Sequence, residues 1–297
     1  MRTVRASGDR FRGLPGFPWP ARRTPVDGLQ VAWVEAGPED GPPVLLLHGE
    51  PSWSYLWRKV IPGLTRVGLR AVAPDLPGFG RSDKPTRVAD YSYARLVGWM
   101  EEWMDRAGLD GVTLVGQDWG SLVGLRMVAD RPDRFERVVV ANGFLPTGEG
   151  SPSPAFRAWR AFARWSPWFP AGRIVDVGTH RSLSAAERAA YDAPFPGAEH
   201  RAGARALPRL VPTRPDQAGA ADNRRAWRAL ERWEKPFLTA FSDGDPVTRG
   251  LERVFHRRVP GARGRDHPTI RGAGHFLQED RGEELARVVA DFVLRNR

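Results

Sequence analysis

A reactive carboxylate stands between two glycines in the segment Gly116–Gly120, which reads Gly-Gln-Asp-Trp-Gly. An apolar run at 112–115 predicts a strand before it, and residues 121–130 are expected to form a helix after it. This spacing is typical of a nucleophile elbow, the tight strand-to-helix turn that lifts one side chain clear of a sheet. Asp118 holds the nucleophile's position, and the backbone N–H of Trp119 should face an anion forming beside it. An aspartate in such a turn often only caps the helix, so the assignment needs partners elsewhere.

Two later residues have the types and the order that complete a hydrolytic triad with Asp118. Asp245 follows a predicted strand at 236–241, and His275 follows another at 269–271. Open α/β sheets place their sites at the carboxyl ends of their strands, so the three side chains should meet there. His275 would act as the general base, and the acid would orient its ring.

The choice of acid and base leaves alternatives open. Asp243 lies two residues before Asp245 and is the competing acid; Asp245 is favoured because its Asp-Pro step suits the turn after the strand. His267 precedes its strand and would lie at the wrong edge of the sheet, and His48 is enclosed in a Gly-Glu-Pro turn that suggests a structural role. The other histidines, expected at the surface, are His180, His200 and His256.

The composition favours one large domain, or a core domain with a substantial insertion, over disorder. The chain has 297 residues, of which 41% are hydrophobic, with 12 Trp and 14 Phe to fill a core. It has no cysteine, so a disulfide framework and a thiolate metal site are excluded, and a reducing compartment fits. No apolar run is long enough for a membrane span, and residues 1–20 do not resemble a signal peptide. A cytoplasmic protein without membrane contact is expected.

The net charge of +10 raises the question of a nucleic-acid partner. Only three of the 45 basic residues are lysines, and the arginines are spread along the chain among Asp and Glu. A nucleic-acid site gathers its cations on one face or stripe. The charge is therefore interpreted as a solvated, arginine-rich surface, and no nucleic-acid partner is expected.

Strands and helices alternate in the first half of the chain, after an arm over 1–25 that is expected to be irregular. Strands are predicted at 30–35, 44–47, 70–74, 112–115 and 138–141, and helices at 55–61, 96–107 and 121–130. Parallel strands need crossover connections, which are usually helical. The pattern therefore predicts an α/β protein with a doubly wound, mostly parallel sheet.

The alternation stops after Asn142. The following stretch is punctuated by proline, dense in Trp, Phe and Arg, and contains a helical capping box at Ser184 and Glu187. We expect it to form an inserted helical cap, and we expect a second capping box, Asp280 with Glu283, to start the last helix. The predicted parts are core residues 1–142, cap residues 143–232 and core residues 233–297.

Four motifs stand out along the chain. They are His-Gly-Glu-Pro-Ser-Trp-Ser-Tyr-Leu-Trp-Arg at 48–58, Gly-Phe-Gly-Arg-Ser-Asp-Lys-Pro at 78–85, Gly-Gln-Asp-Trp-Gly-Ser at 116–121 and Gly-His-Phe-Leu-Gln-Glu at 274–279. Together they resemble the haloalkane dehalogenases of the α/β-hydrolase superfamily, from about Phe11 to the C-terminus. The resemblance implies an α/β-hydrolase fold and a detoxifying hydrolysis of a small halogenated hydrocarbon by water, with release of halide and no metal or organic cofactor.

The residue after His-Gly distinguishes two branches of that family, and this sequence has Glu50 there. In the other branch an asparagine at this position helps to hold the halide, and the acid follows an earlier strand. Here the earlier strand ends in Asn142, with no carboxylate beside it. Both departures imply the branch in which a cap tryptophan completes the halide site and the acid is the later aspartate.

The cap stretch that matches this branch is Ala-Phe-Arg-Ala-Trp-Arg-Ala-Phe at 155–162. The resemblance therefore implies that Trp159 binds halide together with Trp119. Trp159 could also be a core aromatic residue of an amphipathic helix, and Trp165 or Trp168 could take its place.

The proposed chemistry accounts for these residue types. A carboxylate that attacks carbon needs no base to activate it, and a departing halide needs charge stabilisation but no proton. Indole N–H donors from Trp119 and Trp159 in apolar surroundings would supply that stabilisation. His275 would then take a proton from the water that hydrolyses the ester on Asp118, while the backbone N–H groups of Glu50 and Trp119 hold the oxyanion.

The expected substrate pocket consists of Leu122, Phe156, Leu207, Pro208, Val211, Val247 and Phe276. An epoxide hydrolase is the nearest rival, but it typically uses cap tyrosines, and the predicted cap holds only Tyr191. A fluoroacetate-type dehalogenase has arginine where Trp119 follows the nucleophile, and an esterase would have serine in place of Asp118. A non-catalytic binding protein of this fold would lack triad members. A monomer or homodimer is expected.

Overall fold

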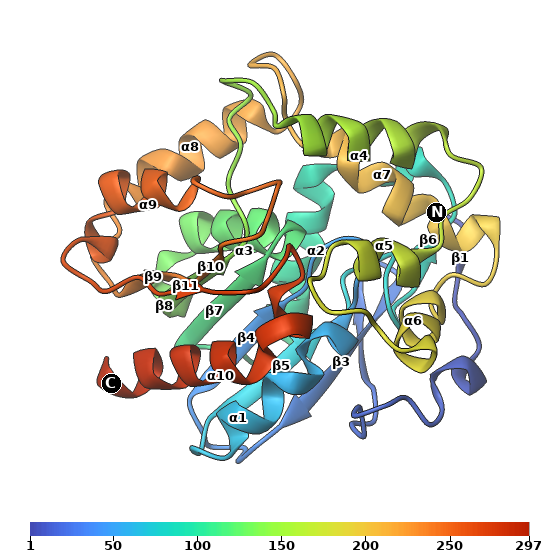
Figure 1. Ribbon diagram of the computed structural model, residues 1–297, viewed down its shortest axis with the longest axis horizontal. Coiled ribbons are helices and arrows are strands. Elements are labelled where there is room, and N and C mark those ends of the chain that lie inside the picture. Colours follow the sequence, from blue (N-terminus) through green and yellow to red (C-terminus); the bar gives the residue numbers. More distant parts are fainter. Residues whose placement is uncertain (297) are drawn as a thin grey trace.

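A seven-stranded sheet forms the centre of the molecule (Figure 1). The computed structural model describes residues 1–296, and the strand order of this sheet is β2-β3-β5-β4-β7-β8-β9. The strands are β2 (Arg22–Val26), β3 (Leu29–Ala36), β4 (Pro43–Leu47), β5 (Arg70–Pro74), β7 (Val112–Gln117), β8 (Phe135–Ala141) and β9 (Phe237–Thr239). The pairs β2/β3 and β3/β5 are antiparallel and the others are parallel, which confirms the predicted mostly parallel α/β sheet.

Successive residues of the central strands point to opposite faces of the sheet. Leu45 and Leu47 of β4 belong to the hydrophobic cluster that includes helices α2 and α3, whereas Val44 and Leu46 belong to the cluster that includes α1 and α10. These helices are α1 (Ile61–Thr65), α2 (Tyr93–Arg106), α3 (Trp119–Asp130) and α10 (Leu277–Arg295). Helices therefore cover both faces, which is why the strand sequence is continuously apolar.

The N-terminal arm is not irregular throughout, so that expectation is wrong. β2 lies within it and pairs antiparallel with β3 through a turn at Asp27 and Gly28, whose φ angles are 44° and 76°. Two central residues with positive φ are the mark of a tight hairpin turn that favours Asp-Gly. Pro25 is tolerated because β2 is an edge strand. In addition, β1 (Thr3–Val4) pairs with β6 (Lys84–Pro85) in a separate two-stranded sheet.

The last helix also begins earlier than predicted. α10 starts at Leu277 and is kinked at Arg281, whose φ of −138° and ψ of 40° are not helical; the capping box expected at Asp280 and Glu283 is wrong, because the Asp280 carboxylate bonds to other segments. The Asp280 carboxylate instead accepts hydrogen bonds from the backbone N–H groups of His180, Arg181 and Gly274, at 3.0, 2.9 and 2.8 Å. The Asp280 carboxylate thus accepts hydrogen bonds from two loops and not from its own helix. The short helix expected at 55–61 is a 3₁₀ helix at Ser54–Lys59 followed by α1.

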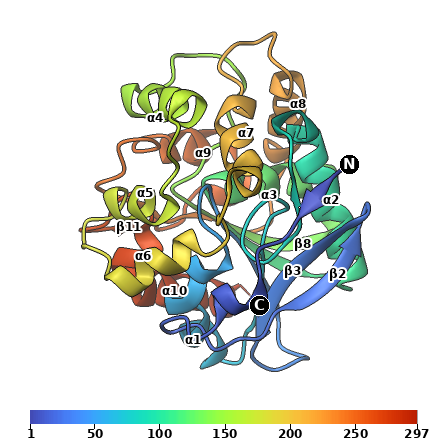
Figure 2. The same cartoon turned by 90° about the vertical axis from the view of Figure 1, so that its right-hand side faces the viewer.

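Between β8 and β9 the chain is helical. The helices are α4 (Pro154–Trp165), α5 (Ala171–Val177), α6 (Ala185–Asp192), α7 (Ala202–Leu210) and α8 (Ala220–Leu230), and α6 starts with the predicted capping box of Ser184 and Glu187. Helix α4 packs against α7, α5 packs against α6, and all four lie away from the sheet layer (Figures 1 and 2). Helix α8, in contrast, packs against α3. None of the helices among residues 1–296 is long and apolar enough to cross a membrane.

A buried ionic cluster fastens the α5–α6 region to the rest of the molecule. Arg58 lies 2.8 Å from Glu187 at the start of α6 and also pairs with Glu279 of α10. Arg181 pairs with both carboxylates at 2.6 Å, and the Tyr191 hydroxyl donates to Glu279. Burial opposes the ionisation of Glu279, but Arg58 and its other partners keep the pKa of this carboxyl below its ordinary value. The cluster therefore joins three separate segments through one ionised carboxylate.

After β9 the chain forms two short parallel strands, β10 (Phe241–Ser242) and β11 (Thr269–Ile270). They are separated by α9 (Glu252–Arg258). The loops after β10 and β11 carry Asp245 and His275, so the pairing of these strands brings the two loops side by side.

Candidate active site

The turn after β7 has the geometry of an elbow. Asp118 has φ 49° and ψ −123°, a strained combination for a residue other than glycine. The turn is tight because β7 and α3 touch: a Cβ at Gly120 would lie 1.9 Å from the Leu47 carbonyl oxygen, and a Cβ at Gly116 would lie 2.8 Å from Ser121 Cα. The Asp118 side chain makes no capping hydrogen bond to α3. It accepts one from the backbone N–H of Glu50 at 2.9 Å instead.

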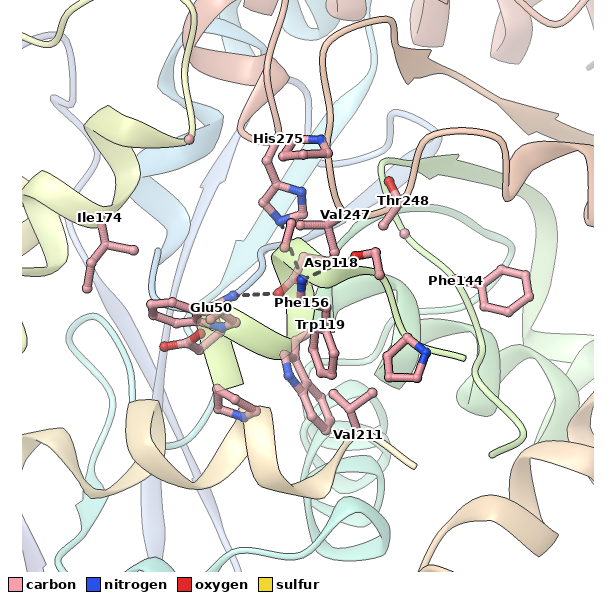
Figure 3. A pocket seen from close by; sticks show the side chains of 18 of the residues that line it. Glu50, Asp118, Trp119, Phe144, Phe156, Ile174, Val211, Val247, Thr248 and His275 are labelled. Carbon is pink, nitrogen blue, oxygen red and sulfur yellow. Dashed lines mark hydrogen bonds and ion pairs between the residues drawn. The ribbon is translucent and has the colours of Figure 1, made fainter. Parts of the chain in front are cut away.

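His275 lies between the carboxylates of Asp245 and Asp118, and Figure 3 shows it beside Asp118. Its Nδ1 is 3.0 Å from Asp245 Oδ2, and its Nε2 is 3.6 Å from Asp118 Oδ2. Burial lowers the pKa of His275, but Asp245 and Asp118 outweigh this effect and raise it to about 10. The structure thus brings the three predicted residues together at the carboxyl edge of the sheet.

Asp245, and not Asp243, is the carboxylate beside the histidine. Asp245 is fully buried and accepts hydrogen bonds from the backbone N–H groups of Val247 and Thr248, at 2.8 and 3.2 Å, and from the Thr248 hydroxyl. Burial raises its pKa, but His275 and these donors lower it below its ordinary value. Asp243 is exposed and accepts from the backbone N–H of Gly272 at 2.8 Å, so it ties the loop after β11 to the loop after β10.

The other histidines have different partners. His48 is buried, and its Nε2 accepts from the backbone N–H of Leu76 at 2.9 Å. His256 and His267 stack with their ring centroids 3.9 Å apart, and His267 Nδ1 accepts from the backbone N–H of Thr239 at 3.1 Å. His180 is exposed and lines the rim of the cavity described below.

Two buried amides support His275, and the sequence did not single out either. The Gln117 amide nitrogen lies 3.2 Å from His275 Nε2 and 3.2 Å from the His275 carbonyl oxygen. The Asn142 amide donates to the carbonyl oxygens of Gly274 and His275, both at 3.0 Å, and to Ser242 Oγ at 2.8 Å. Both amides stand at the ends of the neighbouring strands β7 and β8, and this position is the signal that could have identified them.

A cavity of about 1700 Å³ opens above Asp118 and His275. Of the predicted pocket residues, Leu122, Phe156, Pro208, Val211, Val247 and Phe276 line it. Leu207 does not belong to the lining among the described residues; it is fully buried in the core. Pro208 lies in the last turn of α7 and Val211 is the residue that ends it, whereas the neighbouring Leu207 points to another face of the helix. Phe144 and Ile174, which the sequence did not single out, also line the cavity (Figure 3).

Both expected halide-binding tryptophans line this cavity. Trp119 is 2% exposed and packs edge-to-face on Tyr93, with 5.2 Å between the ring centroids. Trp159 of α4 stacks on Phe162, with 5.7 Å between the ring centroids. Of the two alternatives, Trp165 is 73% exposed and is not among the described residues that line the cavity, whereas Trp168 contributes to the lining although it is 77% exposed.

Comparisons with known proteins agree with this geometry. The family model for the alpha/beta hydrolase fold matches residues 42–281. The chain is 53% identical over 291 residues to a haloalkane dehalogenase of Mycolicibacterium paratuberculosis, covering 96% of each chain. It is 48% identical over 301 residues to a haloalkane dehalogenase of Psychrobacter cryohalolentis, covering 100% of this chain and 99% of the relative.

A solved structure is similar over nearly the same length. The tetrameric haloalkane dehalogenase DpaA from Paraglaciecola agarilytica superposes with a TM-score of 0.89 at 32% identity, covering 97% of each chain. These two sequence relatives cover 96% and 100% of the chain, and the superposition covers 97% of it. The chain therefore belongs to the haloalkane dehalogenase family of the α/β-hydrolase fold.

Proposed function

We propose that this chain hydrolyses haloalkanes to a primary alcohol and halide through a covalent alkyl ester on Asp118. The observation that carries the proposal is the placement of His275 between Asp245 and Asp118, at 3.0 and 3.6 Å, beneath a cavity whose lining includes Trp119 and Trp159. The family membership supports the same reaction. The partners of this protein are a small halogenated hydrocarbon, water and the released halide.

In the first step an Asp118 carboxylate oxygen attacks the carbon that bears the halogen. The carbon–halogen bond breaks as the carbon–oxygen bond forms, and the electron pair leaves with the halide. The indole N–H groups of Trp119 and Trp159 donate to this anion in a cavity that is largely apolar. This displacement moves no proton, so His275 is not required for it.

In the second step water attacks the carboxyl carbon of the ester. His275 takes the proton of this water through Nε2, and Asp245 stabilises the resulting imidazolium through Nδ1. The backbone N–H of Glu50, already 2.9 Å from Asp118 Oδ1, and that of Trp119 hold the oxyanion. Ester formation removes the Asp118 charge that helps to raise the pKa of His275, so this pKa falls, the ring loses its proton, and the neutral ring can then accept the proton of the water.

The epoxide hydrolase alternative requires phenol donors in the cavity, but all four tyrosines lie outside the cavity lining among residues 1–296. Tyr191 donates to Glu279, Tyr91 to the Pro85 carbonyl and Tyr93 to the Leu122 carbonyl. Tyr55 is buried beside Arg58, and no tyrosine of residues 1–296 lines the cavity. An alkoxide from a ring-opened epoxide would therefore lack its usual donors.

We also propose that residues 143–232 act as a cap that closes the site, with core parts at 1–142 and 233–297. Helices α4, α5 and α7 of this segment supply cavity walls, which supports the cap role. Helix α8 packs on α3 and supports the sheet layer more than the cap. The cytoplasmic location, the monomeric or homodimeric state and the independence from metals and organic cofactors stay predictions.

The test is halide release from bromo-, chloro- and iodoalkanes, with styrene oxide as the rival substrate. The wild type should release halide, and Asp118→Ala should release none because no other group can form the ester. Turnover of styrene oxide in the absence of halide release would favour the epoxide hydrolase. Halide release by Asp118→Ala at the wild-type rate would refute the nucleophile.

A further inference from the structure

Two segments of the helical region between β8 and β9 carry arginines and no acidic residue. Residues 150–175 hold four arginines and residues 200–215 hold four more, and neither range contains Asp or Glu. Elsewhere arginines often pair with nearby acids, as Arg131 and Arg134 do with Asp105. The eight arginines of the two segments are Arg157, Arg160, Arg164, Arg173, Arg201, Arg205, Arg209 and Arg214.

The fold brings the arginines of α4 and α7 together in one basic face. The two helices pack side by side (Figure 2), and arginines spaced three or four residues apart share one side of each helix. Arg205 donates to the carbonyl oxygens of Ala163 and Pro167, and Arg209 donates to that of Arg164, all at 3.4 Å. The guanidinium groups of α7 therefore lie over the C-terminal end of α4, next to the arginines of that helix.

This basic face has almost no carboxylate partner. Of the eight arginines, only Arg214 forms an ion pair among residues 1–296, with Asp216 at 3.3 Å. Burial lowers the pKa of Arg205, and the charges of Arg201 and Arg209 lower it further, so these guanidinium groups are close enough to repel one another. An anionic partner would relieve this repulsion.

Exposed apolar side chains lie beside the basic face. Seven large apolar side chains of residues 1–296 are exposed, and four of them, Phe162, Trp165, Trp168 and Val177, come from one segment. Arg164 lies over the Trp165 ring, 4.8 Å from its centroid. Phe162, Trp168 and Val177 also line the active-site cavity. Because they are both exposed and cavity-lining, they form part of the cavity mouth.

We infer that the basic face, together with the four exposed apolar side chains, docks on a membrane that contains anionic phospholipid. Arginine binds phosphate groups bidentately, and tryptophan favours the boundary between lipid headgroups and acyl chains. A nucleic acid would also pair with arginines, but Val177 has no ring to stack on a base, whereas lipid takes up aromatic and aliphatic side chains alike.

This contact would be peripheral, without a spanning helix, and it differs from the absence of membrane contact that the sequence led us to expect. It goes beyond the proposed function, since docking needs no turnover. The cavity mouth would face the lipid, so an apolar ligand could pass from the bilayer into the cavity. That last consequence alone rests on the proposed function.

The experiment is co-sedimentation of the full chain with vesicles of phosphatidylcholine, with and without about one third phosphatidylserine. The wild type should bind only the anionic vesicles. Combining Arg164→Gln with Arg209→Gln should weaken this binding about 25-fold, because each arginine near the surface contributes about fivefold. The matched control combines Arg253→Gln with Arg287→Gln, which removes the same charge from exposed residues of α9 and α10. Its binding should stay within about twofold of the wild type.

A second variant tests the apolar part of the surface without changing the charge. Trp165→Ala should weaken vesicle binding about tenfold, the effect of keeping roughly 50 Å² of indole surface out of the lipid. Trp165 is 73% exposed, so its circular dichroism spectrum should match that of the wild type.

The inference is overturned if the control pair loses as much binding as the Arg164 and Arg209 pair, because net charge alone would then explain the binding. It is also overturned if Trp165→Ala binds like the wild type. Tighter binding of a single-stranded oligonucleotide than of anionic vesicles, lost in the Arg164 and Arg209 pair, would make the face a nucleic-acid site instead. Failure of the proposed function is a separate result, a wild type that releases no halide from any haloalkane.

Discussion

The role of Asp245 can be tested with a single-atom change, Asp245→Asn. Its Oδ2 is the atom 3.0 Å from His275 Nδ1, while the backbone N–H of Val247 is held by Oδ1 at 2.8 Å. The amide can keep the Oδ1 contact but replaces the charged acceptor facing the ring. Loss of a hydrogen bond to a charged group costs about 1.5–3 kcal/mol, which corresponds to roughly 10- to 150-fold in rate. Only ester hydrolysis should slow, since the attack of Asp118 needs no base.

Rapid mixing with an alkyl bromide separates the two steps. Asp245→Asn should release one equivalent of bromide per site at close to the wild-type rate and then turn over about 10- to 150-fold more slowly. Mass spectrometry should find the alkyl ester on Asp118 during this slow phase. Asp243→Asn is the control, because the exposed Asp243 contacts Gly272 and not the ring; its steady-state rate should stay within about twofold of wild type. A larger loss in Asp243→Asn, or a slow phase in Asp245→Asn without ester, would refute the reasoning.

Replacing His275 with Phe should leave the first bromide burst intact and trap the ester on Asp118, and mass spectrometry should detect it; a variant with full turnover would remove His275 from the mechanism. Trp159→Phe should weaken bromide binding about 10- to 100-fold in fluorescence titrations, because it removes only the N–H donor. The same change at Trp165 or Trp168, which are 73% and 77% exposed, should have almost no effect, and a larger effect there would mean that α4 is misplaced. The pKa of His275, raised to about 10 by Asp245 and Asp118 against burial, should fall when the ester neutralises Asp118. An indicator dye should therefore record a proton released with the bromide burst about one pH unit below that value, and no such release in His275→Phe.

The parts of the fold that the sequence predicts well are those with local signals. The strand β7 is a continuous apolar run, and the glycines around Asp118 are required by contacts at the turn that follows it. The strand β2 was missed because its residues, Arg-Arg-Thr-Pro-Val, have little apolar character and form a strand by pairing with β3. The Asp27-Gly28 dipeptide was the local signal for this hairpin.

The sequence predicts the reacting residues of the site better than it predicts the residues that pack around them. Asp118, Asp245 and His275 follow strand ends, so their meeting follows from the sheet topology. The contact of the Gln117 amide with His275 joins residues that are 158 positions apart in the sequence. The sequence places Gln117 at a strand end, but no local window of sequence identifies the partner of its amide. The rotation of α7 that turns Leu207 into the core is a packing outcome of the same kind.

The cavity walls and the reacting groups come from different parts of the chain. Asp118, Asp245 and His275 belong to loops at the sheet edge, whereas much of the wall comes from α4, α5 and α7. No hydrogen bond joins the side chains of these helices to the triad among residues 1–296, so the lining side chains other than Trp159 of α4 can vary with little effect on the reaction. Substrate range and reaction chemistry can thus evolve independently. Substitutions in these helices can give new substrates while the same two-step hydrolysis is retained.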